Sequence, residues 1–137
     1  DALAEAGLDV KPMPVEQGYF TYASGLEAAG RMLAQGKLPT AIFASNDDMA
    51  AAAVGVAHRM GLHIPADLSI VGFDDTQLAT SIWPELTTIR QPIAEMARSA
   101  VSLLQERLRN GEMPDEPERV LPYQLMDRGS SGPPPAA

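Results

Sequence analysis

The sequence predicts an α/β protein with three layers, α/β/α, around a mostly parallel sheet. An apolar run at 41–44 leads into a polar cluster and then an Ala-rich stretch that ends at Gly61. This is the pattern of a buried strand that enters a helix. A second buried run, 68–73, follows a short loop. Strand, helix and strand of these lengths form a βαβ unit, which joins parallel strands.

The residues before this unit predict a helix end, an extended segment and a helix. Residues 1–8 resemble the last turns of a helix, so we expect a fragment of a longer protein. The segment 10–17 contains two prolines and is expected to be extended, with an edge strand as one interpretation. Over 18–35, apolar residues recur every three or four positions, as on a helix that covers a sheet. Gly25 and Gly30 in that helix indicate close approach to a neighbouring backbone.

The residues after the unit predict one more strand and one long helix. The connection 76–83 is followed by a short strand at 86–90. A helix over 92–110 is expected next, because Pro92 suits a first helical position and a regular apolar stripe follows it. Asn110-Gly111 ends that helix.

The domain organisation expected from the sequence is a single unit. Residues 119–126 are read as a last extended element. We expect one domain over 1–128, followed by a disordered tail over 129–137, where Gly, Ser and Pro dominate.

Composition excludes several classes of protein. The net charge of −8 has the wrong sign for a surface that follows nucleic-acid phosphates or an anionic membrane. The chain has no cysteine, so disulfides and thiolate chemistry are excluded. No apolar run approaches the roughly 20 residues of a membrane-spanning helix.

Polar side chains follow three predicted strands, where each strand ends. They are Asn46 and Asp47, then Asp74 and Asp75, and then Gln91 with its neighbour Arg90. Because parallel strands share one carboxyl edge, these side chains are expected along one rim, which is where open α/β sheets bind ligands.

A fourth junction brings Tyr19 and Phe20 to the start of a helix. Carboxylates and amides beside aromatic rings suit a neutral polyhydroxylated ligand, because carboxylates accept from hydroxyls and rings cover the apolar face of a sugar. A phosphate would need several cations or a Gly-rich loop, and Arg90 is the one basic residue at these junctions.

Each of these residues also has a structural interpretation. Asn46 is a good helix cap, and consecutive aspartates favour turns. An enzyme that uses Asp47, Asp74 and Asp75 as a metal or acid–base cluster is a weaker hypothesis, since neither histidine is expected at the rim. No metal-ligand spacing or nucleophile motif is present, so we expect no catalytic residue, metal or cofactor.

Three phrases of the sequence resemble hallmarks of the LacI/GalR-type bacterial transcriptional regulators. They are PTAIFASNDDMA at 39–50, IPADLSIVGFDDT at 64–76 and PELTTIRQP at 84–92. Their order and spacing match as well, and the similarity covers about 18–128.

The resemblance implies the C-terminal lobe of an effector-binding domain with a type I periplasmic-binding-protein fold. Such a lobe binds a mono- or disaccharide effector, contacts DNA only through a headpiece that this chain lacks, and works in the cytoplasm. The family's sugar-contacting Asn, Asp and Gln match Asn46, Asp74 and Gln91, and its stacking aromatic matches Phe20.

The resemblance also implies a homodimer. The family pairs through the helix after Asn-Asp and through the connection after the second strand. The matching residues here are Met49, Ala52, Ala53, Val56, Leu78, Ile82 and Trp83. A second hypothesis is a lobe of an extracytoplasmic sugar-binding protein of a transporter, since that class shares the fold.

Overall fold

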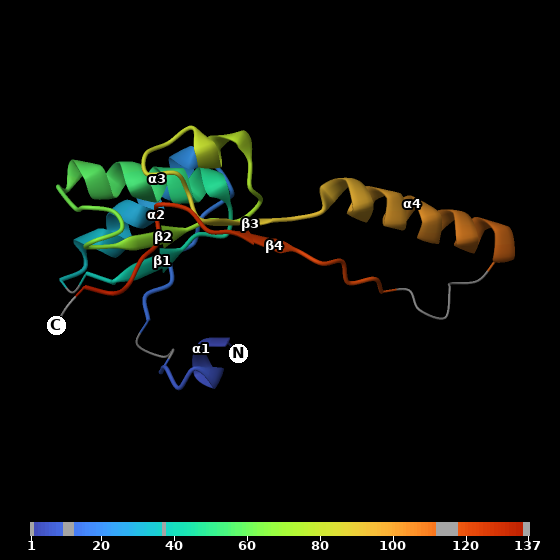
Figure 1. Cartoon of the computed structure of the whole chain (residues 1–137), viewed down its shortest axis with the longest axis horizontal. Helices are drawn as coiled ribbons and strands as arrows, with labels where there is room; N and C mark the ends of the chain where they lie inside the picture. The colour runs from blue at the N-terminus through green and yellow to red at the C-terminus, as the bar shows by residue number, and fades with distance from the viewer. Residues whose placement is uncertain (1, 10–12, 37, 112–117, 136–137) are drawn as a thin grey trace.

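The computed structural model describes residues 2–9, 13–36, 38–111 and 118–135. Its elements run along the chain from an N-terminal helical turn to a C-terminal strand (Figure 1). They are α1 (Ala2–Glu5), α2 (Tyr22–Ala34), β1 (Ala41–Phe43), α3 (Asp47–Arg59), β2 (Ser69–Val71), the 3₁₀ turn η1 (Gln77–Thr80), β3 (Thr88–Arg90), α4 (Ile93–Asn110) and β4 (Gln124–Met126).

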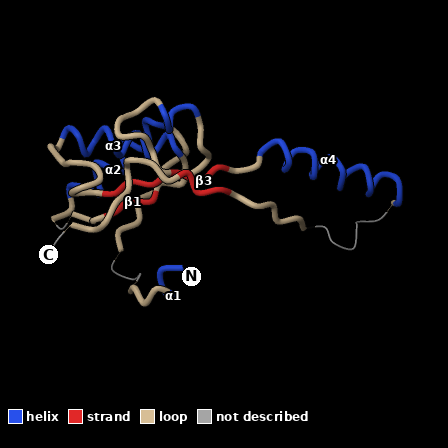
Figure 2. Tube along the Cα trace, in the orientation of Figure 1, coloured by secondary structure: helices blue, strands red, loops and turns tan. Residues whose placement is uncertain are grey.

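The strands confirm the predicted parallel sheet. β1 pairs with β2 in parallel, with Ala41 opposite Ser69. Parallel bridges from Val71 to Thr87 and from Asp74 to Arg90 continue the sheet from β2 to β3. β4 then pairs with β3 in the antiparallel direction, so the strands follow one another as β1, β2, β3 and β4. Figure 2 shows the strands in red and the helices in blue.

α2 and α3 pack against each other above the β1–β2 strands (Figure 1). A Cβ at Gly25 would lie 2.7 Å from Cα of Met49 and 2.8 Å from Cβ of Ala52, so the predicted close approach at Gly25 is confirmed. The same prediction is wrong for Gly30, where a Cβ would meet no heavy atom within 4 Å. The capping box between Thr21 and Ser24 explains why α2 begins later than predicted.

The sheet has one covered face and one open face at β1. Ile42 points into the core, whereas the neighbouring Phe43 is 65% exposed. α4, whose stripe suits a covering helix, instead extends away from the sheet beyond β3 (Figure 1) and has no buried residue. The α/β class with a parallel sheet is confirmed, with α2 and α3 as the helical layer on one face. Neither α1 nor α4 has a buried residue, so these helices do not form the second helical layer of the three-layer prediction.

The expected disordered tail is wrong for residues 129–132. Ser130 is fully buried, and its hydroxyl accepts from the amide of Thr87 at 2.8 Å and donates to the carbonyl of Ile70 at 2.6 Å. The amide of Ile70 donates to the carbonyl of Ser130 at 2.8 Å. Residues 136–137 of the predicted tail lie outside the described residues. The C-terminal segment thus completes the hydrogen bonding at the start of β2.

Two further expectations concern the N-terminal region and membranes. Within 13–17 the chain forms no strand, and residues 10–12 of the predicted edge strand lie outside the described residues.

Among the helices that the structure describes, none is both long and apolar enough to span a bilayer.

Candidate functional site

Asn46 joins two of the predicted junctions. It is the N-cap of α3, where its side-chain oxygen accepts from the amide of Met49 at 3.0 Å. Its Nδ2 donates to the carbonyl of Phe20 at 3.1 Å, so the start of α3 holds the segment that carries the two aromatic rings. The side chains of Tyr19 and Phe20 are themselves exposed, by 73% and 64%. The structure therefore brings Asn46 and Phe20 together at the rim, with both rings open to solvent.

Asp47, a predicted ligand contact, is fully buried. Its Oδ2 accepts from the amide of Thr76 at 2.6 Å and from the hydroxyl of that residue at 3.1 Å, and its Oδ1 accepts from the hydroxyl of Thr88 at 2.6 Å. A carboxylate with no exposed surface and with both oxygens bonded inside the protein is not placed to meet a ligand. The geometry corrects the prediction: Asp47 ties α3 to the segments after β2 and in β3.

Asp74 and Gln91 meet directly. Nε2 of Gln91 donates to Oδ1 of Asp74 at 2.7 Å, although the two residues are 17 positions apart in sequence. Both remain partly exposed. The amide of Asp74 also donates to the carbonyl of Ile89 at 2.9 Å, which aligns the end of β2 with β3. Because Asp47 binds Thr76, two residues after Asp74, the junctions of Asn46, Asp74 and Gln91 share one edge of the sheet, as predicted.

Asp75 forms the centre of an ion-pair cluster that the sequence reasoning did not identify. Its Oδ2 accepts from Nε of Arg90 and its Oδ1 from Nη2 of Arg128, both at 2.6 Å. Only 5% of the Asp75 side chain is exposed. Burial raises the pKa of this carboxyl, but the hydrogen bonds and charges of Arg128 and Arg90 outweigh burial and hold the pKa below its ordinary value of 3.8.

Three non-glycine residues of the described chain have positive φ, and all three lie at this edge. They are Phe20 at 57°, Asp74 at 112° and Asp75 at 55°. Backbone in these regions is costly for residues with a Cβ, and such conformations gather at ligand-binding and catalytic sites. The rim therefore carries a feature of functional sites that is independent of its side-chain chemistry.

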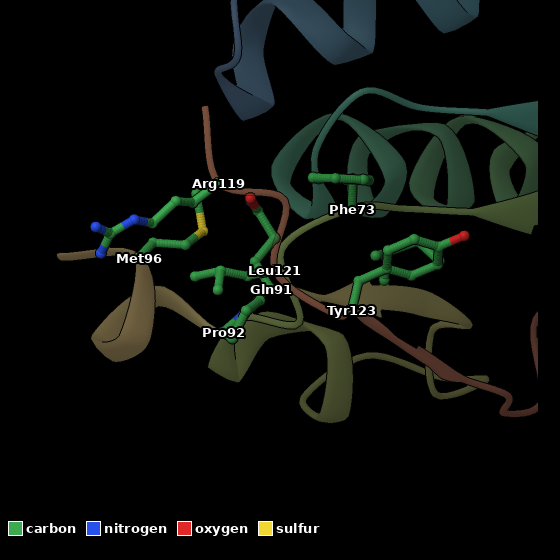
Figure 3. Close-up of a pocket in the computed structure, with 8 residues that line it drawn as sticks. Phe73, Gln91, Pro92, Met96, Arg119, Leu121 and Tyr123 are labelled. Carbon is green, nitrogen blue, oxygen red and sulfur yellow. The ribbon is translucent and has the colours of Figure 1, made fainter. Parts of the chain in front are cut away.

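A cleft of about 460 Å³ opens beside the rim (Figure 3). Gln91 lines the cleft while it holds Asp74, so the polar pair and the cleft are continuous. The remaining lining residues are mostly apolar: Phe73, Ile89, Pro92, Met96, Arg119, Leu121 and Tyr123. The sequence reasoning missed these residues. Among them, only Phe73 could have been identified from the sequence, because it is an aromatic residue directly before the candidate Asp74.

The predicted pairing surface divides into a covered part and an open part. Ala52, Ala53 and Val56 are 0%, 2% and 6% exposed, and Met49 is half-buried. The α3 part of the prediction is therefore wrong for the three fully covered residues, because α2, the sheet and η1 of the same chain already surround this apolar helix. The connection after β2 still has surface open to a second copy: Trp83 is 81% exposed, and Leu78 and Ile82 are half-buried.

The three aspartates of the enzyme hypothesis have separate partners. Asp47 binds threonine groups, Asp75 binds arginines and Asp74 binds Gln91. Within the described part of the chain, no group of three or more His, Cys, Asp or Glu side chains is arranged to hold a metal ion. The three carboxylates therefore do not share a common partner.

Fold and site together define a ligand-binding α/β module of the periplasmic-binding-protein type. The sequence matches the periplasmic binding protein-like domain over residues 1–131. It is 38% identical to catabolite control protein A of Priestia megaterium over 130 residues, which is 95% of this chain and 39% of that protein.

Solved structures agree with this match. A complex of the transcriptional regulator CelR with cellobiose superimposes with a TM-score of 0.87 at 35% identity, over 95% of this chain and 39% of the other. The lac repressor dimer, bound to operator and an anti-inducer, gives a TM-score of 0.84 at 31% identity, over 94% and 44% of the two chains.

The chain belongs to the periplasmic binding protein-like domain family, in the form found in the effector-binding domains of LacI-family transcriptional regulators. It spans about two fifths of the length of the curated relatives that it matches.

Proposed function

We propose that this chain is the ligand-sensing C-terminal lobe of a LacI/GalR-type transcriptional regulator, which binds a small sugar-like effector at the carboxyl edge of its sheet. The observation that carries the proposal is the meeting of the strand-end junctions at one rim, where Asp74 and Gln91 form a 2.7 Å hydrogen bond. The three positive-φ residues at the same edge support it.

The chemistry of this rim suits hydroxyl groups. The Asp74 carboxylate is an acceptor, and the Gln91 amide offers both a donor and an acceptor, so one sugar hydroxyl can bridge the pair. The exposed ring of Phe20 is available to cover an apolar sugar face. Cellobiose in the CelR complex is a disaccharide, which supports a mono- or disaccharide as the effector of this chain.

The proposal makes this chain one side of a two-lobed cleft. α4 leaves its apolar stripe open, with Leu104 60% and Leu108 83% exposed, and the cleft of about 460 Å³ is open beside it. Apolar faces that are open to water mark interaction surfaces. We assign the covering role to a second lobe, and closure of the two lobes on an effector would change the relation of the DNA-binding heads.

Pairing and DNA binding belong to the same proposal. We assign pairing of two copies to the connection that holds Leu78, Ile82 and Trp83. DNA contact is assigned to a headpiece outside this chain, because the charge of −8 here repels phosphates. The lac repressor dimer on its operator supports both assignments. The lobe catalyses nothing in this account, and the regulator works in the cytoplasm.

The experiment is a saccharide titration of the 137-residue chain, followed by NMR. A panel of mono- and disaccharides that includes cellobiose should shift the side-chain amide signals of Asn46 and Gln91. The affinity should be weak, about millimolar, because one lobe supplies half of the contacts. A micromolar dissociation constant would contradict the two-lobed cleft, and no response from any sugar would contradict the effector class. Thermal shift of the full-length regulator with the same panel would identify the effector.

The transporter hypothesis makes a different prediction for the parent gene. A regulator has a helix-turn-helix before the effector domain, whereas an extracytoplasmic binding protein has a signal peptide. The matched relatives are regulators, which favours the first alternative.

A further inference from the structure

The turn after β2 has an unusual backbone. Asp74 and Asp75 are consecutive, and both have positive φ, at 112° and 55°. Neither residue is glycine, so each conformation is disfavoured by its own Cβ. Backbone of this kind persists only where the surrounding structure holds it in place. The contacts that hold the turn therefore decide where the Asp74 carboxylate points.

Asp75 makes the strongest of these contacts. Arg90 and Arg128 bind its two oxygens from different segments, at 2.6 Å each. Arg128 is itself held in the sheet: its Nη1 donates to the carbonyl of Leu86 at 2.8 Å, and its amide donates to Oγ1 of Thr87 at 3.0 Å. Its side chain is only 12% exposed. The Asp75 carboxylate thus fastens the turn, through Arg128, to the residues directly before β3.

The second ion pair of Asp75 is with Arg90, the residue directly before Gln91. Two consecutive residues after β2 bind two consecutive residues at the end of β3: Asp75 binds Arg90, and Asp74 binds Gln91. A displacement of Asp75 would therefore move the turn and the strand end relative to each other. The spacing of Asp74 and Gln91, which the proposed effector has to bridge, depends on this neighbouring pair.

Asp75 is not placed to contact an effector itself. Its side chain is 5% exposed, and each carboxylate oxygen already accepts from a guanidinium. Because so little of the carboxylate is open to solvent, and the Arg128 side chain beside it is also nearly buried, a ligand hydroxyl has little room to reach either oxygen. Any influence of Asp75 on effector binding therefore acts through Asp74 and Gln91.

We infer that Asp75, held by Arg128 and Arg90, is a positioning residue for effector binding that acts through Asp74 and Gln91. The inference rests on the proposed function for its ligand. Its structural part, the dependence of the Asp74–Gln91 hydrogen bond on Asp75, can be observed without any ligand.

The test compares Asp75→Asn with two reference variants of the 137-residue chain. Asp75→Asn keeps the shape of the side chain and removes its charge. Asp74→Ala removes the acceptor of the Gln91 bond and shows where the free Gln91 amide resonates. Val54→Ala changes a core residue of α3, 3% exposed, and lowers stability without removing any group that takes part in the hydrogen bonds of Asp74 and Asp75.

The first readout is the side-chain amide of Gln91 in the ligand-free proteins. In Asp75→Asn its signals should move toward those of Asp74→Ala, while Val54→Ala should leave them in place. The second readout is the affinity for cellobiose, or for the best-binding sugar of the panel, at a temperature where all variants are folded. Asp75→Asn should weaken it by about tenfold, and Val54→Ala should not change it.

The outcomes separate the inference from the proposed function. Gln91 signals that stay at their wild-type positions in Asp75→Asn, or an unchanged affinity, would overturn the inference alone. A wild-type chain that binds no sugar of the panel would contradict the proposed function alone. If Asp75→Asn does not fold, Arg90→Gln removes only the half-exposed arm, and its Gln91 signals should shift in the same direction by a smaller amount; no shift would again overturn the inference.

Discussion

The hydroxyl of Thr88 donates a 2.6 Å hydrogen bond to Oδ1 of Asp47, and both side chains are completely buried. The bond joins the first turn of α3 to β3 beneath the rim. A Cβ at Gly72 would lie 2.5 Å from the same oxygen, so the chain directly after β2 can pass close to the buried carboxylate because residue 72 is glycine.

The first prediction concerns this bond. Thr88→Val keeps the shape of the side chain but leaves a buried carboxylate oxygen without its donor. The free energy of unfolding should fall by about 2 kcal/mol, since hydrogen bonds to buried charged groups have this magnitude. Urea denaturation followed by circular dichroism measures the change. Thr80→Val is the control, because Thr80 is exposed and its hydroxyl donates to the carbonyl of Gln77 within η1. A similar loss in both variants would contradict the role given to Asp47.

The second prediction uses two glycines of α2 that receive the same substitution. Gly30→Ala should stabilise the chain by about 1 kcal/mol, because alanine is the better helix former and the new methyl group meets nothing within 4 Å. Gly25→Ala should destabilise it by about 1–3 kcal/mol, because the methyl group would overlap Met49 and Ala52 of α3. Thermal unfolding of the two variants should therefore shift in opposite directions, and a shift of the same sign would show that α2 and α3 are not in close contact at Gly25.

The third prediction follows from the lowered pKa of Asp75. A carboxyl whose pKa is lower in the folded state stabilises the protein above its unfolded pKa, and this stabilisation is lost as the pH falls through the folded pKa. The stability difference between wild type and Asp75→Asn should therefore be constant from neutral pH down to about pH 5. It should shrink as the pH falls below the ordinary value of 3.8. Urea denaturation at a series of pH values measures this difference. A difference that widens on acidification would contradict the stabilising role given to the ion pairs of Asp75 with Arg90 and Arg128.

The strands and helices near the rim were predictable because local pattern determines them. β1 and β2 lie in apolar runs of the sequence. α3 begins at the N-cap Asn46 and ends just before Gly61, where φ is 75°. The direction of parallel strands then places Asp74 and Gln91 at one edge without further information. Asp47 and Asp74 look alike in sequence, however, since both follow a strand. Long-range contacts distinguish them: Asp47 is covered by Gly72, Thr76 and Thr88, whereas Asp74 meets Gln91 and stays partly exposed.

Three other features could not be predicted for physical reasons. The composition of 129–135 suggests disorder, but the single hydroxyl of Ser130 satisfies two backbone groups of the sheet, and such long-range bonds leave no periodic signal. The stripe of α4 shows that this helix is amphipathic, but a stripe does not specify which surface covers it. The charged partners of Asp75 lie 15 and 53 residues away, beyond any local motif.

The fourth prediction compares an α4 residue with a core residue. Leu104→Ser should change the stability of the isolated chain by less than about 0.5 kcal/mol, because no residue of α4 is buried. Leu86→Ala should cost about 3 kcal/mol, because Leu86 is fully buried. In the full-length regulator, Leu104→Ser should become clearly destabilising if a second lobe covers α4. Differential scanning calorimetry of both lengths makes the comparison, and equal effects of Leu104→Ser in the two would argue against a covered α4.

The last prediction concerns the pairing surface around Trp83. This side chain is 81% exposed beside the half-buried Ile82, and Trp is enriched among the few residues that carry most of the binding energy of an interface. Trp83→Ser should shift the full-length regulator from dimer toward monomer in a concentration series by sedimentation velocity. Tyr19→Ser is the matched control, because Tyr19 is 73% exposed at the rim and has no part in the proposed pairing. Dimers that persist in Trp83→Ser would show that pairing does not depend on this surface. The buried residues of α3 would not be an alternative, because their own chain already covers them. Loss of dimers in Tyr19→Ser alone would place that surface at the rim.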